Sequence, residues 1–228
     1  MRTVAADIER FYRLLRVAQD RKLFDSAGAD PWPIRGVYFF FESGEARATH
    51  PGGLSEPRVV RVGTHAVSSN SKSTLWGRLR THRGSRHGGG NHRGSIFRLH
   101  VGAALLARDG VEPGTWGRGS SATKEIRTSE VGLEQAVSKC ISAMRVSFVA
   151  VPDEPGPKSA RAVIERNSIA LLSNVRRSSD PPSPGWLGRH SPRPEIVESG
   201  LWNLNYVDDR YDPGFLDVLE SFVRAPRV

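Results

Sequence analysis

The stretch Gly36-Val37-Tyr38-Phe39-Phe40-Phe41 decides how we interpret the fold. A short run of β-branched and aromatic side chains favours a buried β-strand, and Asp30-Pro31-Trp32-Pro33 breaks the chain just before it. Arg58-Val59-Val60-Arg61-Val62-Gly63 has the same character and predicts the partner strand. The segment 42–57 then forms a long hairpin connection between two neighbouring strands.

Helical periodicity surrounds these strands. Residues 2–23 place Val4, Ile8, Phe11 and Leu15 on one apolar face, which predicts an amphipathic helix. Further helices are expected over 74–83, 130–143, 159–174 and 211–223, with a third strand over 145–151. The expected fold is therefore α+β, with a small, mainly antiparallel sheet of about three strands flanked by helices. We divide the chain into an N-terminal helix and lead-in (1–34), a central domain (35–175) and a Pro-rich spacer with a C-terminal helical arm (176–228).

Composition excludes several classes of protein. The chain has 228 residues, of which 38% are hydrophobic and 25% charged, as is usual for a globular domain. The longest apolar run, Val37 to Phe41, is far too short to cross a membrane. The N-terminus shows no apolar signal core, so we expect a cytoplasmic protein. The single cysteine, Cys140, cannot form an intramolecular disulfide and is expected to be a small buried side chain.

The distribution of charge points to nucleic acid. The formal net charge is +9, and residues 57–108 contain no Asp or Glu but nine arginines, Lys72 and five of the seven histidines. We expect much of this charge to face water or an anionic polymer, because unpaired cations are costly to bury. An arginine-rich proteome would be the ordinary explanation of such a composition. The residues expected to contact nucleic acid are Arg58, Lys72, Arg80, Arg83, Arg86, His92 and Arg93.

Three short motifs, read in order, resemble the GIY-YIG nuclease superfamily, and most closely its restriction-endonuclease-like branch. They are Gly36-Val37-Tyr38 on the first strand, Val60-Arg61-Val62-Gly63 on the second, and Arg78 with His82 on the next helix. Glu165, after the third strand, stands where the family places its glutamate, and His92 is similar to a further histidine of many members. Each motif alone is weak, whereas their order and context together carry the resemblance.

Phosphodiester cleavage gives each of these residue types a role. A helix-borne carboxylate, Glu165, can hold one Mg²⁺ or Mn²⁺ ion, which lowers the pKa of bound water. Arg78 offers a permanently charged planar fork to two phosphate oxygens, and His82 lies one helical turn beyond it. The resemblance implies that Tyr38 orients or deprotonates the attacking water. We therefore expect Tyr38, Arg61, Arg78, His82 and Glu165 to be catalytic, with Glu165 as the metal ligand.

Two departures from the family pattern affect this hypothesis. Arg61 stands where the family's second tyrosine usually lies, and a guanidinium can clamp phosphate but cannot act as a base. The segment 42–57 is longer than the family's usual hairpin, so we interpret it as an insertion that faces DNA or forms an oligomer contact. Asn174 is a weak match to an asparagine of restriction-type relatives, because its nine-residue spacing from Glu165 places it on the opposite helical face.

These observations predict a divalent-metal-dependent DNA endonuclease, related to restriction or defence, that acts on duplex DNA and works as a homodimer if it cuts both strands. The alternative is a non-catalytic nucleic-acid-binding module with a degenerate nuclease fold. Each candidate also has an ordinary structural interpretation. In that interpretation Tyr38 is a core aromatic side chain, and Glu165 is an ion-pair partner of Arg161 or Arg166. A separate alternative is an HNH-like metal site formed by His82, His87 and His92. In the arm, Trp186, Arg189, Trp202 and Tyr206 contact either bases or the core.

Overall fold

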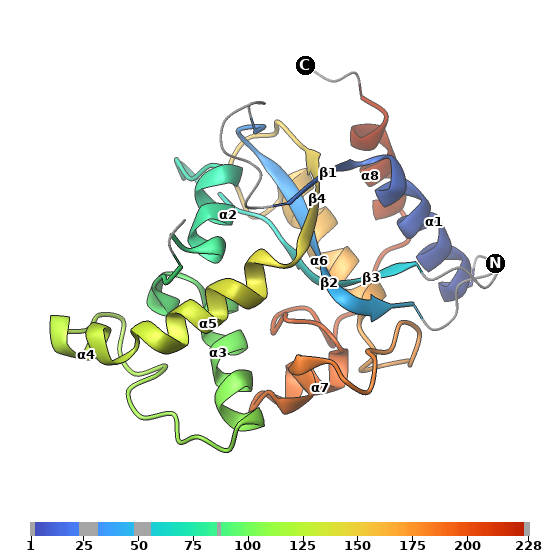
Figure 1. Cartoon of the computed structure of the whole chain (residues 1–228). Coiled ribbons are helices and arrows are strands. Elements are labelled where there is room, and N and C mark those ends of the chain that lie inside the picture. The colour runs from blue at the N-terminus through green and yellow to red at the C-terminus, as the bar shows by residue number, and fades with distance from the viewer. Residues whose placement is uncertain (1–2, 23–31, 48–55, 86–87, 226–228) are drawn as a thin grey trace.

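A central antiparallel sheet organises the molecule (Figure 1). A computed structural model describes residues 3–22, 32–47, 56–85 and 88–225 of the chain. The four strands are β1 (Gln19–Lys22), β2 (Gly36–Ala46), β3 (Pro57–Gly63) and β4 (Arg145–Ala150), in the order β1-β4-β2-β3. The α+β prediction with a small antiparallel sheet is confirmed, and β1 adds a short fourth strand because the chain pairs with β4 as it leaves the first helix.

Alternation along β2 builds two separate cores. Val37, Phe39 and Phe41 point to one face of the sheet, and Tyr38 and Phe40 point to the other, as expected from the two-residue repeat of a strand. The first face packs against α1 (Val4–Val17), α6 (Ala160–Leu172) and α8 (Phe215–Val223). The second packs against α2 (Leu75–Arg83), α3 (Ile96–Arg108) and α5 (Val131–Ser142). Figure 1 shows these two groups of helices on opposite sides of the sheet.

Local sequence signals fix the starts of the helices that matter most for the site. Thr74 caps α2, where its hydroxyl accepts a hydrogen bond from the amide of Gly77. Ser159 caps α6 in the same way through the amide of Ala162, at 3.2 Å, as the sequence predicts. Such caps satisfy amide donors that have no partner within the first turn of a helix.

Other segments differ from the expectation. The irregular stretch before α5 contains a further helix, α4 (Lys124–Ser129), and the glycine loop after α2 contains a short 3-10 helix, η1 (His92–Gly94). The Pro-rich spacer likewise includes η2 (Leu187–His190) and α7 (Pro194–Ser199). In the expected insertion 42–57, β2 extends to Ala46, and residues 48–55 lie outside the described part of the chain.

The C-terminal arm covers the outer edge of β3. The amide of Trp202 donates to the carbonyl of Val60 at 2.7 Å. The side chain of Asn203 accepts from the amide of Val62 at 3.1 Å and donates to its carbonyl at 2.9 Å. An edge strand otherwise presents unpaired backbone groups. The arm therefore completes the sheet edge beside Arg61, which lies on β3.

None of the helices in the described ranges has both the length and the apolar character required to cross a bilayer.

Candidate active site

Tyr38 lies buried at the centre of the predicted site. On β2 it pairs across the sheet with Gly63 at the end of β3, and its side chain is on the α2 and α3 face. The phenol fills the space that a side chain would occupy at Gly63, where an added Cβ would lie 2.3 Å from the Tyr38 hydroxyl oxygen. Gly63 is therefore required by this close contact. The Tyr38 hydroxyl forms a 2.8 Å hydrogen bond with Nε2 of His82.

His82 connects Tyr38 to the start of α3. Its Nδ1 lies 2.7 Å from the hydroxyl of Ser95, which also accepts a hydrogen bond from the amide of Arg98 as the α3 N-cap. Burial lowers the pKa of His82 well below its usual value, and the positive charges of Arg61, Arg78 and Arg98 lower it further. His82 is therefore a neutral imidazole, in which one ring nitrogen donates and the other accepts.

Arg61 is a buried cation without a carboxylate partner among the described residues. Its Nη1 donates to the carbonyl of Trp202, and its guanidinium carbon lies 4.7 Å from the centre of the Phe97 ring. Burial lowers the pKa of Arg61, while Tyr38 acts in the opposite direction. The other fully buried arginines form ion pairs, as Arg58 does with Glu45 at 3.0 Å. Arg61 thus lies beside the Tyr38 phenol with no carboxylate in direct contact among the described residues, and Glu165 raises its pKa only from a distance.

Glu165 reaches the same region from α6. Its Oε1 accepts a 3.0 Å hydrogen bond from the amide of Thr64, the residue that follows β3. Burial raises the pKa of Glu165, whereas this hydrogen bond and the charges of Arg61 and Arg78 lower it. Arg78, on α2, is held by a long 3.4 Å contact from Nη1 to the carbonyl of Gly94. Arg61 and Arg78 thus lie within electrostatic range of both His82 and Glu165, and His82 is hydrogen-bonded to Tyr38.

The alternative role of Glu165 as an ion-pair partner of its helical neighbours is wrong. Arg161 pairs with Asp153, and the guanidinium of Arg166 donates from Nε to Asp209 at 2.8 Å. Among the described residues, the carboxylate of Glu165 is therefore held by a backbone amide and not by a cation in direct contact.

Arg161 is a positioning residue that the sequence analysis missed. It is fully buried, and its Nη1 donates to the carbonyl of His65, directly after Thr64. Arg161 lies one helical turn before Glu165, so it fastens α6 to the same segment whose amide holds the carboxylate. The i,i+4 spacing to Glu165 was the available signal, but it suggested an ion pair between the two rather than a shared anchor.

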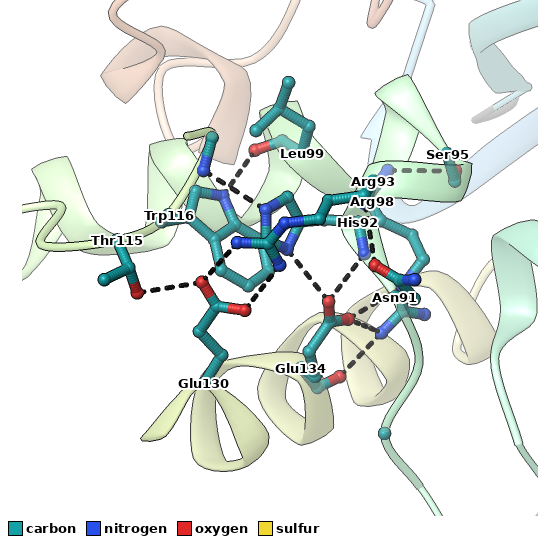
Figure 2. Close-up of polar contacts among 12 residues, drawn as sticks. Asn91, His92, Arg93, Ser95, Arg98, Leu99, Thr115, Trp116, Glu130 and Glu134 are labelled. Atoms are coloured by element: carbon teal, nitrogen blue, oxygen red, sulfur yellow. Dashed lines mark hydrogen bonds and ion pairs between the residues drawn. The ribbon is translucent and has the colours of Figure 1, made fainter. Parts of the chain in front are cut away.

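Three residues predicted to contact nucleic acid are instead internal, and this is a correction. Arg58 is fully buried against Glu45. The His92 ring stacks on Trp116 at 3.8 Å between centroids and has Nδ1 3.0 Å from Glu134. Arg93 donates two hydrogen bonds to Glu130, at 2.6 and 2.9 Å. Figure 2 shows the last two pairs side by side between η1 and α5. Glu130 thus neutralises Arg93, and Glu134 holds the His92 ring, inside the fold.

The remaining predicted contacts divide between surface and interior. Lys72 and Arg80 are exposed. Arg83 is buried, with its guanidinium 5.2 Å from the ring of Trp76. Arg86 lies outside the described residues. Lys72 and Arg80 therefore keep an orientation in which contact with a nucleic-acid backbone is feasible.

The HNH-like alternative has no structural support. Within the described ranges, no group of three His, Cys, Asp or Glu side chains is arranged to hold a metal ion. His82 and His92 are engaged with Ser95 and Glu134 respectively, and His87 lies outside the described residues. Asn174 is also structural, because its amide nitrogen donates to the carbonyls of Asp180 and Ser199.

Comparison with known proteins identifies the family of the chain. The model of the GIY-YIG domain family matches residues 2–227, nearly the whole chain. No curated protein and no solved structure matches it. The matched domain is one of nucleases, which typically use divalent metals and act on nucleic acid. Since the match includes both strands and both helices that carry Tyr38, Arg61, Arg78 and Glu165, the chain belongs to the GIY-YIG domain family.

Proposed function

We propose that this chain is a divalent-metal-dependent endonuclease that hydrolyses phosphodiester bonds in duplex DNA. The observation that carries the proposal is Arg61: a buried guanidinium without a carboxylate partner in the described residues, beside the Tyr38–His82 hydrogen bond. Burying an unpaired cation is unfavourable unless an anion joins it. A phosphate group is an anion whose geometry a planar guanidinium fork matches with two hydrogen bonds.

Arg61 and Arg78 supply the charge that cleavage requires. A pentacoordinate phosphate in the transition state carries more negative charge than the substrate, and groups fixed in advance around it lower the barrier. Each arginine lowers the pKa of Glu165 and of His82, so both arginines lie within electrostatic range of these two side chains. In this proposal Arg61, at the position where the family's second tyrosine usually lies, binds phosphate but does not act as a base.

Tyr38 would take the proton of the attacking water, and His82 would orient the Tyr38 oxygen. Neutral His82 accepts a hydrogen bond from the Tyr38 hydroxyl at Nε2 and donates one from Nδ1 to Ser95. After the Tyr38 hydroxyl has released its proton to solvent, its oxygen takes a proton from the attacking water, which leaves hydroxide and restores the phenol. The positive charge of Arg61 lies beside the oxygen that takes this proton. Phenols are otherwise weak bases at neutral pH because they ionise only near pH 10.

Glu165 is the residue that would hold Mg²⁺ or Mn²⁺. Mg²⁺ is commonly bound through one or two carboxylates, with water and substrate phosphates completing the shell. One carboxylate whose Oε1 is oriented by Thr64 fits this donor set, with the second oxygen left for the ion. When bound, the ion lowers the pKa of water and polarises the phosphate.

The test is cleavage of supercoiled plasmid with Mg²⁺ or Mn²⁺, and with chelator. We expect nicked or linear product from the wild-type chain, and none from Glu165→Gln or Arg78→Gln. Glu198→Gln, an exposed carboxylate on α7, serves as the matched control and should cut normally. A clean wild-type preparation that binds DNA but leaves it intact in every metal would refute the enzyme and favour the non-catalytic binding module.

The biological setting belongs to the same proposal. We propose a cytoplasmic restriction or defence enzyme that dimerises when it cuts both strands, with the division into 1–34, 35–175 and 176–228 as its domain plan. A methyltransferase reading frame next to this one would support restriction. Analytical ultracentrifugation with and without duplex DNA would test the dimer.

A further inference from the structure

Tyr206 is the exposed aromatic side chain among the three arm residues, Trp186, Trp202 and Tyr206, that were expected to contact either bases or the core. Trp186 is 1% exposed and Trp202 0%, so both belong to the core, whereas Tyr206 is 40% exposed. Arg189 donates to the carbonyls of Ser183 and Pro182 within its own loop. The expected choice between bases and core is thus settled for the tryptophans in favour of the core, and Tyr206 is the aromatic of this group that reaches solvent.

The backbone at Tyr206 is held in an unfavourable conformation. Its φ is +66°, a region that side chains other than glycine, asparagine and aspartate rarely adopt. Such conformations persist where the surroundings impose them, and they cluster at sites that contact ligands. Asn203, fixed on Val62 of β3, holds the chain on one side of Tyr206. The exposed ring is therefore presented by an anchored segment.

Arg166 completes the surface. Its guanidinium carbon lies 5.6 Å from the centre of the Tyr206 ring, and its Nε donates to Asp209 at 2.8 Å. The Arg166 side chain is 58% exposed, and neither of its Nη groups has a hydrogen-bond partner among the described residues. Arg166 directly follows Glu165 on α6. A guanidinium whose two Nη groups are free of described partners is thus held beside an exposed ring, on the residue that follows the proposed metal ligand in α6.

The nearby carboxylates leave the two Nη groups of Arg166 without a hydrogen-bond partner among the described residues. Asp209 is paired with Arg166, and Asp208 lies 3.2 Å from Nε of Arg176. Asp212 accepts from the amide of Gly214. Carboxylates that hold arginines in place are compatible with phosphate binding because a guanidinium has five donors.

We propose that Tyr206 and Arg166 form a nucleic-acid contact beside the active site: the ring stacks on an unstacked base next to the scissile bond, and the Arg166 fork binds a neighbouring phosphate. This rests on the proposed function, since it makes Glu165 the adjacent catalytic group. Stacking on an aromatic ring needs a base whose face is free. The surface therefore favours DNA that is forked, flapped or locally opened over perfectly paired duplex.

The experiment measures binding, so it is independent of cleavage. In the full-length Glu165→Gln background, fluorescence anisotropy gives the affinity for a forked duplex and for a fully paired duplex across a salt series. Tyr206→Gly removes the ring but suits the positive φ, so it preserves the backbone. We expect it to weaken binding to the fork by about 5- to 100-fold, as loss of one stacked base does, with a smaller effect on paired duplex. Tyr206→Phe should restore most of the affinity.

Arg166→Gln should weaken binding to both probes and reduce the salt slope by about 1, as loss of one phosphate contact does. The matched control is Arg108→Gln at the C-terminus of α3, an exposed arginine that also donates from Nε to an aspartate. Tyr206→Gly with unchanged affinity for the fork, or with equal loss on both probes, overturns base stacking. Arg166→Gln with the same slope as Arg108→Gln overturns the phosphate contact. Plasmid left intact by the wild-type chain would instead count against the endonuclease alone.

Discussion

Replacing Arg61 should separate activity from stability. If Arg61 serves to bind a substrate phosphate rather than to stabilise the fold, Arg61→Met will abolish cleavage and leave the free energy of unfolding almost unchanged. Methionine has a similar length and flexibility and fills the same buried space. Arg58→Met is the matched control, because Arg58 is a neighbour on β3 that is equally buried but paired with Glu45.

The expected magnitudes follow from the contacts of the two arginines. Arg61→Met loses the hydrogen bond to Trp202, which leaves a carbonyl unpaired at a cost of about 1–3 kcal/mol. It also relieves the burial of an uncompensated charge, which costs several kcal/mol, so the net change should stay within about 2 kcal/mol of zero. Arg58→Met leaves the carboxylate of Glu45 buried without its cation, at a cost of about 3–5 kcal/mol.

Thermal unfolding followed by tryptophan fluorescence measures the difference. At about 2–4 °C per kcal/mol for a chain of this size, Arg58→Met should lower Tm by about 6–20 °C. Arg61→Met should change Tm by less than about 8 °C in either direction. Plasmid cleavage is measured on the same samples. An Arg61→Met protein that unfolds as early as Arg58→Met, or that still cuts at the wild-type rate, would refute the assignment of Arg61 to phosphate.

Three further predictions concern Tyr38, Gly63 and His100. Tyr38→Phe keeps the buried ring but removes the hydroxyl next to His82. The cleavage rate should fall by about 10²- to 10⁴-fold, while the free energy of unfolding should drop by only about 1 kcal/mol. Cleavage by Tyr38→Phe at the wild-type rate would exclude the proton transfer. Gly63→Ala places a Cβ 2.3 Å from the Tyr38 hydroxyl, so it should lower the free energy of unfolding by about 1–3 kcal/mol and reduce activity. The control Gly132→Ala in α5, whose added Cβ meets no atom within 4 Å, should raise the free energy of unfolding by about 0.5–1 kcal/mol. Equal effects of the two variants in urea unfolding would contradict the close contact. Burial, reinforced by neighbouring arginines, lowers the pKa of His100 to about 4, so its unfolded form binds the proton first and stability falls as pH drops from about 6.5 towards 4. His100→Phe should reduce the loss of stability between pH 7.5 and 4.5 by about 2–3 kcal/mol, and an unchanged pH profile would show that His100 is not buried as a neutral side chain.

The excess positive charge of the chain is evident from the sequence, but the exposure of several individual arginines was predicted wrongly. Residues 57–108 lack acids, and this suggested that most of their arginines face outward. The structure supplies the carboxylates from outside that window: Glu45 pairs with Arg58, and Glu134 pairs with Arg98. A window of sequence cannot show this, because ion pairs join residues that are far apart in the chain. The excess positive charge of the whole chain is unaffected by the error.

Most of the secondary structure could be predicted because it depends on local signals. The aromatic run at 36–41 requires a strand, and the Ser159 cap fixes where α6 begins. β1 and α4 were missed, since β1 exists through its pairing with β4 and α4 has no buried side chain to give it an apolar face. Short elements of this kind are set by their tertiary contacts rather than by their own sequence.

The sequence by itself determined the class of fold, the family motifs and the identity of the five proposed catalytic residues, because residue type and spacing carry that information. Only the tertiary structure decided which charges are available: it neutralised Arg58 and Arg93 with distant carboxylates, fixed His92 on Glu134, and left Arg61 beside Tyr38 with no carboxylate in direct contact in the described ranges. It also brought Tyr206 to Arg166, 40 positions earlier in the chain. The physical reason is that electrostatic and stacking energies depend on distance in space and on burial, and neither quantity can be read along a linear chain.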